Sequence, residues 1–224
     1  MRNGYGVYVS MDGSIYKGEW KNDKAWGKGI YTNKIGITYK GDWLNDKANG
    51  KGILTTPDGA YYEGEWKDDM QNGYGIEVIS NESKYEGQFK DGEKHGKGTF
   101  KWKDNAEYEG DWLHNVMEGR GIYKWSDGRM YIGEWKNNLM NGKGVYTWPN
   151  GRKYEGSYKN DKKEGYGVYT WEDGKIYKGQ WKNGKQEGEG VFISKDEIIR
   201  TGLWKNGKRV KWLKILNQDG TEIT

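Results

Sequence analysis

Tyr131-Ile132-Gly133-Glu134-Trp135 is the stretch that decides the fold, because its Tyr-x-Gly-x-aromatic pattern returns every 23 residues. A Gly-x-Gly pair, as at Gly119, keeps the same spacing, and so does an Asp or Asn that is usually followed by glycine, as at Asp127. Three marks with one period and no insertion predict a small structural unit repeated along the chain. The tyrosines that open the pattern are Tyr16, Tyr39, Tyr62, Tyr85, Tyr108, Tyr131, Tyr154 and Tyr177.

The alternation inside one repeat predicts a β-hairpin. Every second residue from Gly119 to Trp125 is glycine or aromatic, which is the period of a strand. Ser126–Arg129 contains Asp-Gly, a strong signal for a tight turn. Tyr131–Trp135 then alternates again and predicts the second strand. We expect Asn137–Asn141 to form the longer loop to the next repeat.

Glycine and large rings share one face of each predicted strand. A ring on one strand can lie over a glycine of its neighbour, which has no Cβ, and shield the bare backbone. Repeated along the chain, this arrangement predicts an all-β fold: an elongated, single-layer antiparallel meander of about 19 strands built from 23-residue hairpins. At ~4.8 Å per strand, its length would be roughly 85 to 90 Å.

The composition fits a thin aromatic layer better than a thick aliphatic core. Only 33% of the residues are apolar and 31% are charged, while 18 tyrosines and 13 tryptophans supply most of the large rings. The absence of cysteine excludes disulfides and thiolate metal sites. With no apolar signal region at Met1–Gly4, these features predict a soluble, intracellular protein.

The net charge of +4 is unevenly distributed. Residues 1–112 carry 16 basic and 19 acidic side chains, whereas residues 113–224 carry 21 and 14. Nucleic-acid binders usually have a steeper basic bias, so we expect no nucleic-acid partner.

The repeat resembles the MORN (membrane occupation and recognition nexus) repeat. Tyr131–Asn137 gives Tyr-x-Gly-x-Trp-Lys-Asn, and Gly142–Gly151 gives Gly-Lys-Gly-Val-Tyr-Thr-Trp-Pro-Asn-Gly. The resemblance covers essentially the whole chain and implies an elongated, twisted sheet. Members made only of these repeats are similar to organisers of cytoskeletal structures, including ciliary radial-spoke heads. Other members join membranes, and some relatives place the repeats before a lipid-kinase or lysine-methyltransferase domain.

The two ends of the chain depart from the pattern. The repeats begin with a half repeat, and we expect residues 1–204 to form the array. Residues 205–224 predict a degenerate capping repeat, because Lys211 and Leu213 replace the glycine pair while Asp219 stays in register. The unpaired strand expected at Gly4–Val9, and the opposite sheet end near Ile223, suggest end-to-end self-association.

Two groups of residues are candidate binding sites. A row of tryptophans precedes the turns of the middle repeats, and exposed aromatic strips are favoured binding surfaces. Packing against adjacent turns is the alternative explanation. The partner-binding candidates are Trp102, Tyr123, Trp125, Tyr146, Trp148, Tyr169 and Trp171.

The densest basic cluster could contact an acidic phospholipid surface, at about 1 kcal/mol per cation, or form a solvated cap. The lipid-contact candidates are Lys205, Lys208, Arg209, Lys211 and Lys214.

The sequence predicts no catalytic, cofactor or metal site. Both histidines, His95 and His114, occupy positions where other repeats place polar residues, so we expect them in loops. The recurring glycines lack the Lys-Ser/Thr of a phosphate-binding loop. We therefore predict a non-enzymatic scaffold that binds protein segments on its aromatic and glycine face, within a larger cytoskeletal or axonemal assembly. Two alternatives are a peripheral membrane module and the targeting half of a longer enzyme.

Overall fold

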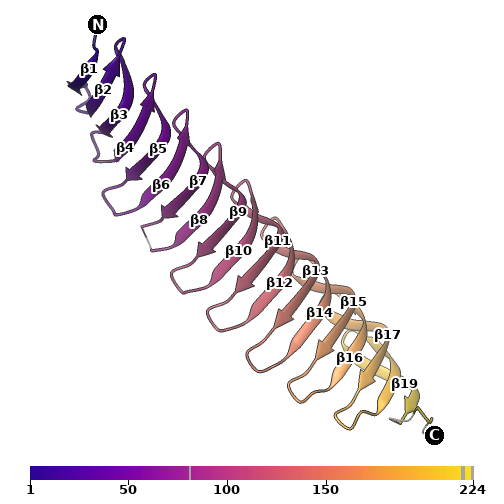
Figure 1. Ribbon diagram of the computed structural model, residues 1–224. Helices are drawn as coiled ribbons and strands as arrows, with labels where there is room; N and C mark the ends of the chain where they lie inside the picture. Colours follow the sequence, from indigo (N-terminus) through magenta and orange to yellow (C-terminus); the bar gives the residue numbers. More distant parts are fainter. Residues whose placement is uncertain (81, 218–219, 223–224) are drawn as a thin grey trace. The chain divides into compact units, whose positions relative to one another are not determined.

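The computed structural model describes residues 1–80, 82–217 and 220–222, so the turn residues Asn81 and Asp219 and the expected sheet end at Ile223 lie outside the described residues. Within the described ranges the chain has no helix. Its 19 strands form an open antiparallel sheet in a meander, with a repeat of about 23 residues. The predicted all-β hairpin fold is therefore confirmed, and successive strands lie side by side in Figure 1.

The chain divides into two compact units, which are described separately. Unit 1 comprises Met1–Asn105 and Asp111–Val116, and unit 2 comprises Ala106–Gly110 and Met117–Thr224. The strands of unit 1 are β1 (Gly4–Val9), β2 (Ile15–Lys21), β3 (Lys24–Thr32), β4 (Thr38–Leu44), β5 (Lys47–Thr55), β6 (Tyr61–Lys67), β7 (Met70–Val78), β8 (Lys84–Lys90) and β9 (Glu93–Lys101).

Residues of β10 (Glu107–Leu113) and β11 (Val116–Lys124) fall in both units. Unit 2 continues with β12 (Met130–Lys136), β13 (Leu139–Thr147), β14 (Lys153–Lys159), β15 (Lys162–Thr170), β16 (Ile176–Lys182), β17 (Lys185–Ile193), β18 (Ile199–Lys205) and β19 (Lys208–Leu216).

The register brings like residues together across neighbouring strands. Between β12 and β13, Tyr131 lies opposite Tyr146 and Gly133 lies opposite Gly144, and a β-bulge follows Gly133. The same pairing recurs in unit 1, where Tyr16 lies opposite Tyr31. Each strand therefore has an aromatic face, which carries the tyrosines, glycines and tryptophans of the repeat, and a polar face, which carries the alternate residues.

The core of each hairpin is a tyrosine lying over two glycines. The Tyr131 side chain is fully buried, and a Cβ added to Gly133 or to Gly144 would lie 2.5 Å from Tyr131 Cζ. The Tyr131 hydroxyl donates a hydrogen bond of 3.1 Å to the Glu134 carbonyl. Trp135 packs edge-to-face on Tyr131, with ring centroids 5.1 Å apart. The predicted covering of glycine by rings is confirmed.

The connections between strands differ from the prediction in one respect. Asn137 and Asn138 alone join β12 to β13, and both adopt positive φ, at 49° and 65°. Leu139–Asn141 belongs to β13 instead of to a longer loop, so that part of the prediction is wrong. The longer connection is residues 125–129, where Gly128 has φ of 85° and its N–H donates to the Trp125 carbonyl at 3.0 Å. Asparagine tolerates positive φ, so an Asn-Asn pair can form the two-residue hairpin turn that Asp-Gly usually marks.

Candidate functional site

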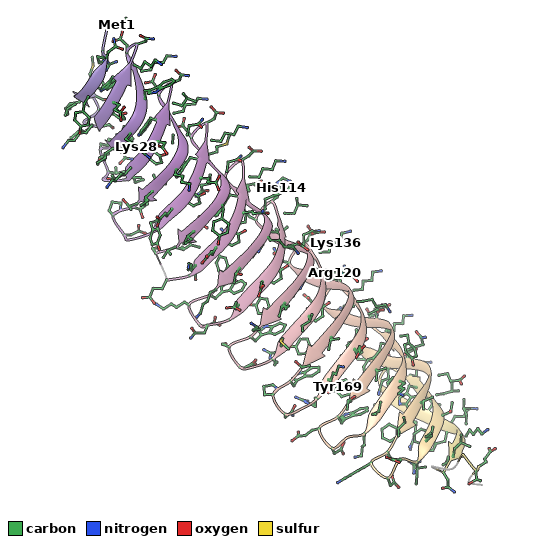
Figure 2. All side chains as sticks on the ribbon, viewed as in Figure 1. Met1, Lys28, His114, Arg120, Lys136 and Tyr169 are labelled. Atoms are coloured by element: carbon green, nitrogen blue, oxygen red, sulfur yellow. The ribbon has the colours of Figure 1, made fainter. Side chains whose placement is uncertain are left out.

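The aromatic face of unit 2 carries a continuous set of rings. Trp125 lies 5.1 Å from Tyr146, Tyr146 lies 4.4 Å from Trp148, and Trp148 lies 5.9 Å from Tyr169, measured between ring centroids. The set continues from Tyr169 to Trp171 at 4.7 Å. The structure therefore brings six of the seven predicted partner-binding residues together, because Tyr123 also contacts Trp125 at 4.5 Å. Tyr169 is labelled in Figure 2, which shows side chains projecting from both faces of the strands.

These rings differ in how much surface they offer. Tyr146 and Tyr169 are only 7% and 8% exposed, so they belong mainly to the packing of the sheet. Tyr123, Trp125, Trp148 and Trp171 are half-buried. Trp102, the seventh candidate, is also half-buried and belongs to unit 1, where its ring lies 4.6 Å from that of Phe100. The tryptophans thus both pack on neighbouring rings and keep one side accessible.

Unit 1 has an aromatic groove that the sequence did not predict. A cavity of about 570 Å³ opens on its aromatic face, over Ala25 and Ala48. The half-buried rings of Tyr31 and Trp43 line it, and Leu54 lines its far part. The signal was present in the chain: these two alanines occupy a repeat position where the other repeats have long side chains.

Three aspartates lie along this groove. Asp46 Oδ1 accepts a 2.7 Å hydrogen bond from the Ala25 N–H, and Asp69 Oδ1 accepts one of the same length from Ala48. Asp23 Oδ1 accepts the Arg2 N–H at 2.6 Å, and this hydrogen bond lowers the pKa of Asp23 below its usual value. An aromatic groove with carboxylates at its margin favours cationic groups.

In unit 2 the aromatic face carries a buried cation of its own. Lys163 Nζ lies 4.4 Å from the ring centroid of Tyr169, 4.7 Å from that of Trp181 and 4.9 Å from that of Tyr154. Burial, with a smaller contribution from Arg152, lowers the pKa of Lys163 to about 8. The rings attract the ammonium group through their faces, while the loss of water disfavours its charge.

The polar face of unit 1 carries a second groove, of about 720 Å³. Lysine stems and isoleucines line it, including Ile53 and Lys28, which is labelled in Figure 2. Lys28 forms an ion pair of 2.5 Å with Asp42. Tyr74, also in this groove, donates a 2.8 Å hydrogen bond to Glu86. Several of its polar groups thus bind each other, whereas the groove on the aromatic face offers ring surfaces beside carboxylates.

The five lipid-contact candidates occupy two faces of the sheet. Lys205 lies opposite Lys208, Lys211 opposite Leu203 and Lys214 opposite Thr201, so the four lysines share the polar face. Arg209 lies opposite Trp204 on the aromatic face, with its guanidinium carbon 4.4 Å from the Trp212 ring centroid. The lysines are exposed, and Lys214 also lies 3.7 Å from Glu222.

The histidines lie together in unit 1. His114 is in a turn as predicted, with φ of 50°, but His95 is within β9, which corrects the expected loop position. His114 Nδ1 contacts Glu93 Oε2 at 2.6 Å, and the two imidazole rings are 6.0 Å apart. Among the residues that the structure describes, no group of three or more His, Asp or Glu side chains is placed to hold a metal ion. The same residues include no helix that could span a bilayer.

Two solved structures illustrate what this fold is similar to. The TCP10 domain of Danio rerio CPAP, in complex with a peptide of STIL, matches with a TM-score of 0.54 and 11% identity, over 95% of this chain and 96% of that one. The TCP domain of Drosophila melanogaster SAS-4, in complex with a proline-rich motif of Ana2, gives a TM-score of 0.39 and 12% identity, over 77% and 88% of the two chains. The first likeness concerns the fold alone, and the second is too low to support an argument. Comparison with curated proteins gave no match.

A family model described as the MORN repeat matches the chain nine times. The matched residues are 1–15, 16–38, 39–61, 62–84, 85–107, 108–128, 131–151, 154–176 and 177–197. These matches follow the 23-residue hairpins described above and cover most of the sequence. The chain therefore belongs to the MORN repeat family.

Proposed function

We propose that this protein is a non-enzymatic scaffold that binds segments of partner proteins on its aromatic face. Through this binding it helps to assemble a larger complex, cytoskeletal or axonemal in keeping with the repeat-only members that it resembles. The observation that carries the proposal is the groove over Ala25 and Ala48, where Tyr31 and Trp43 present ring surface beside Asp46. Aromatic side chains contribute strongly to protein interfaces.

Two further facts support this choice of face. The tryptophans of unit 2 keep one side accessible, so the aromatic surface is not confined to unit 1. The Danio rerio CPAP domain, whose fold is similar, was solved with a bound peptide of STIL. A sheet of this type thus serves as a peptide-binding platform in that protein.

The experiment uses two adjacent residues of β5 that line opposite grooves. Leu54 lies in the groove of the aromatic face and Ile53 in the groove of the polar face. A photo-crosslinking amino acid, p-benzoyl-phenylalanine, is placed at position 54 or at position 53 of the full chain, and each variant is irradiated in extract of the source cells. We expect a discrete crosslinked protein from position 54 and none from position 53. The reverse result would contradict the proposal, and circular dichroism would verify that both variants fold.

A peripheral membrane module is the second candidate function, and the shared face of Lys205, Lys208, Lys211 and Lys214 favours it. We expect the protein to sediment with phosphatidylcholine vesicles only when they contain phosphatidylserine, and less so at higher salt. Replacing Lys208, Lys211 and Lys214 by Gln should abolish this binding. A matched triple change of the exposed Lys159, Lys162 and Lys182 should preserve most of it. Binding that ignores both salt and acidic lipid would exclude this function.

A further inference from the structure

One position on the aromatic face carries a cation in four of its ten repeats. The residues spaced by 23 from Arg2 include Lys94, Lys163 and Arg209, besides two methionines and two glutamines. Alanine occupies this position only at Ala25 and Ala48. The groove of about 570 Å³ lies over these two alanines, where the other repeats place a long side chain of their own.

Arg2 shows how a guanidinium group is held at this position. Its guanidinium carbon lies 3.9 Å from the Trp20 ring centroid and 4.8 Å from that of Tyr8. Its Nε lies 3.6 Å from Asp23 Oδ1, which also accepts the Arg2 backbone N–H. Two rings and one carboxylate therefore surround this cation.

The same three partners recur one repeat later, around Ala25. Tyr31, Trp43 and Asp46 each follow their Arg2 counterparts by 23 residues. The geometry is preserved as well: the Tyr8 and Trp20 centroids are 6.0 Å apart at 77°, and those of Tyr31 and Trp43 are 6.4 Å apart at 69°.

Asp46 also repeats the role of Asp23. It accepts the Ala25 N–H as Asp23 accepts that of Arg2. A carboxylate can accept several hydrogen bonds, so Asp46 can keep this bond and also pair with a cation. The receptor for a basic group is thus present at Ala25, whereas the basic side chain is not part of that repeat.

The other cations at this position show which partners an ammonium group needs. Lys94 Nζ lies 5.2 Å from the Tyr85 ring centroid and forms a 2.5 Å ion pair with Glu77. Lys163 is surrounded by rings, but Gly184 stands at its equivalent of Asp46. A cation over Ala25 would have both the rings and the carboxylate.

We propose that the groove over Ala25 accepts an arginine or lysine side chain of a bound protein segment, which stacks on Trp43 and Tyr31 and pairs with Asp46. This inference rests on the proposed function and deepens it. The groove continues to Ala48 and Asp69, two strands away or about 10 Å. An extended peptide covers that distance in about three residues. The second carboxylate therefore favours a protein segment over a single quaternary ammonium headgroup.

The test compares two isosteric probes on the full chain. The methylamide of N-acetyl-arginine carries a guanidinium group, and the citrulline equivalent carries a neutral urea. Binding is followed by the NMR shifts of the Trp43 indole N–H and the Ala25 amide. We expect saturable shifts with the arginine probe and at least about tenfold weaker binding of the citrulline probe, since charge-assisted hydrogen bonds are about twice as strong as neutral ones.

Two variants locate the binding group. Asp46→Asn keeps an acceptor for the Ala25 N–H, as Asn138 does for Met117 at 2.7 Å, but removes the charge. It should weaken the arginine probe by about fivefold, the effect of a partly exposed ion pair. Ala25→Met fills the groove with the residue that other repeats use and should abolish the shifts. Asp68→Asn, at an exposed turn position, should leave the affinity unchanged.

Equal binding of the arginine and citrulline probes would overturn the inference, and so would the absence of saturable shifts. Phosphocholine that binds as tightly as the arginine probe would also overturn it, in favour of a lipid headgroup. The photo-crosslink at position 54 separates this result from the broader proposal. A crosslink that forms without any arginine binding leaves the binding face in place and removes only the basic side chain.

Discussion

At the residue scale, the fold depends on pairs of residues that have opposite sizes. The fully buried Tyr131 covers Gly133 and Gly144, and its hydroxyl satisfies the Glu134 carbonyl. A sequence pattern could predict this pairing, because rings and glycines alternate with the period of a strand. It could not predict which rings stay accessible, since exposure depends on the neighbouring repeat. Ala25 opens a groove only because Tyr31 and Trp43 flank it.

Adding one methyl group tests the ring-over-glycine packing. A Cβ at Gly144 would lie 2.5 Å from Tyr131 Cζ, so Gly144→Ala must displace a buried ring and should lower the free energy of unfolding by about 3 kcal/mol. Gly6 faces Trp20 at 3.5 Å, an ordinary contact, and Gly6→Ala should change stability by less than about 0.5 kcal/mol. Urea denaturation measures both. Equal effects at the two sites would contradict this packing.

Lys163 predicts a dependence of stability on pH. Its pKa in the folded protein, about 8, lies below the model value of 10.5, so the unfolded state binds more protons between these values. The free energy of unfolding should therefore rise with pH from about 8 toward 10.5, and the desolvated charge should oppose folding below pH 8. The ring contacts offset part of that cost.

Lys163→Met should then raise the free energy of unfolding at pH 7 by about 1 to 3 kcal/mol and flatten its rise above pH 8. Methionine fits this position, since Met117 and Met140 occupy it in neighbouring repeats. Lys162→Met, at the exposed adjacent residue, is the matched control. Denaturant titrations at pH 7 and pH 9 measure the change. A destabilised Lys163→Met with an unchanged pH profile would contradict the assignment.

At the scale of the hairpin, the two-residue turns set the register. Asn138 uses its positive φ of 65° and both of its polar ends: its Oδ1 accepts the Met117 N–H and its N–H donates to the Met117 carbonyl at 3.0 Å. The sequence predicted the strands but assigned the tight turn to Ser126–Arg129, because Asp-Gly is the more familiar turn signal. Asn-Asn and Asn-Asp pairs carry the same information at the opposite ends of the strands.

Substitutions at Asn138 separate the two roles of this residue. Asn138→Ala loses the hydrogen bond and places Cβ at positive φ, so it should cost about 2 kcal/mol. Asn138→Gly loses only the hydrogen bond and should cost about 1 kcal/mol, and Asn138→Asp, which keeps the acceptor, should cost less. Thermal unfolding followed by circular dichroism gives this ranking. Glycine ranking below alanine would contradict the turn geometry.

At the scale of the whole molecule, the repeated tyrosines predict how the protein unfolds in alkali. Burial raises the pKa of Tyr16 and of Tyr177 to about 12, and raises those of the other core tyrosines in the same direction. Each contributes stability that is present below pH 10 and is lost as pH rises through the folded pKa.

We therefore expect a cooperative loss of the β-sheet signal above about pH 10 that coincides with tyrosinate absorbance at 295 nm. Simultaneous recording of absorbance and circular dichroism tests this expectation. Tyrosines that all ionise near pH 10 while the sheet remains intact would show that the rings are not buried in solution.

The assignment of function also belongs to this scale, because it depends on which of two faces is used. Repeat spacing predicted both faces and the family, and these predictions are confirmed. The proposed groove arises from the alanines of two repeats, a departure from the pattern that acquires meaning only when the neighbouring strands are in place. Trp43 lies on the aromatic face, where its Nε1 donates to the Gly29 carbonyl at 3.2 Å. Trp26 lies opposite Glu19 on the polar face, beneath Lys21.

The central claim is that the aromatic face is the binding surface, and the indole N–H resonances of Trp43 and Trp26 test it most directly. The full chain, labelled with nitrogen-15, is titrated with the protein segment recovered by crosslinking at position 54. The account predicts that the Trp43 resonance shifts with saturation while that of Trp26 stays in place. A shift of Trp26 with an unchanged Trp43 would contradict it.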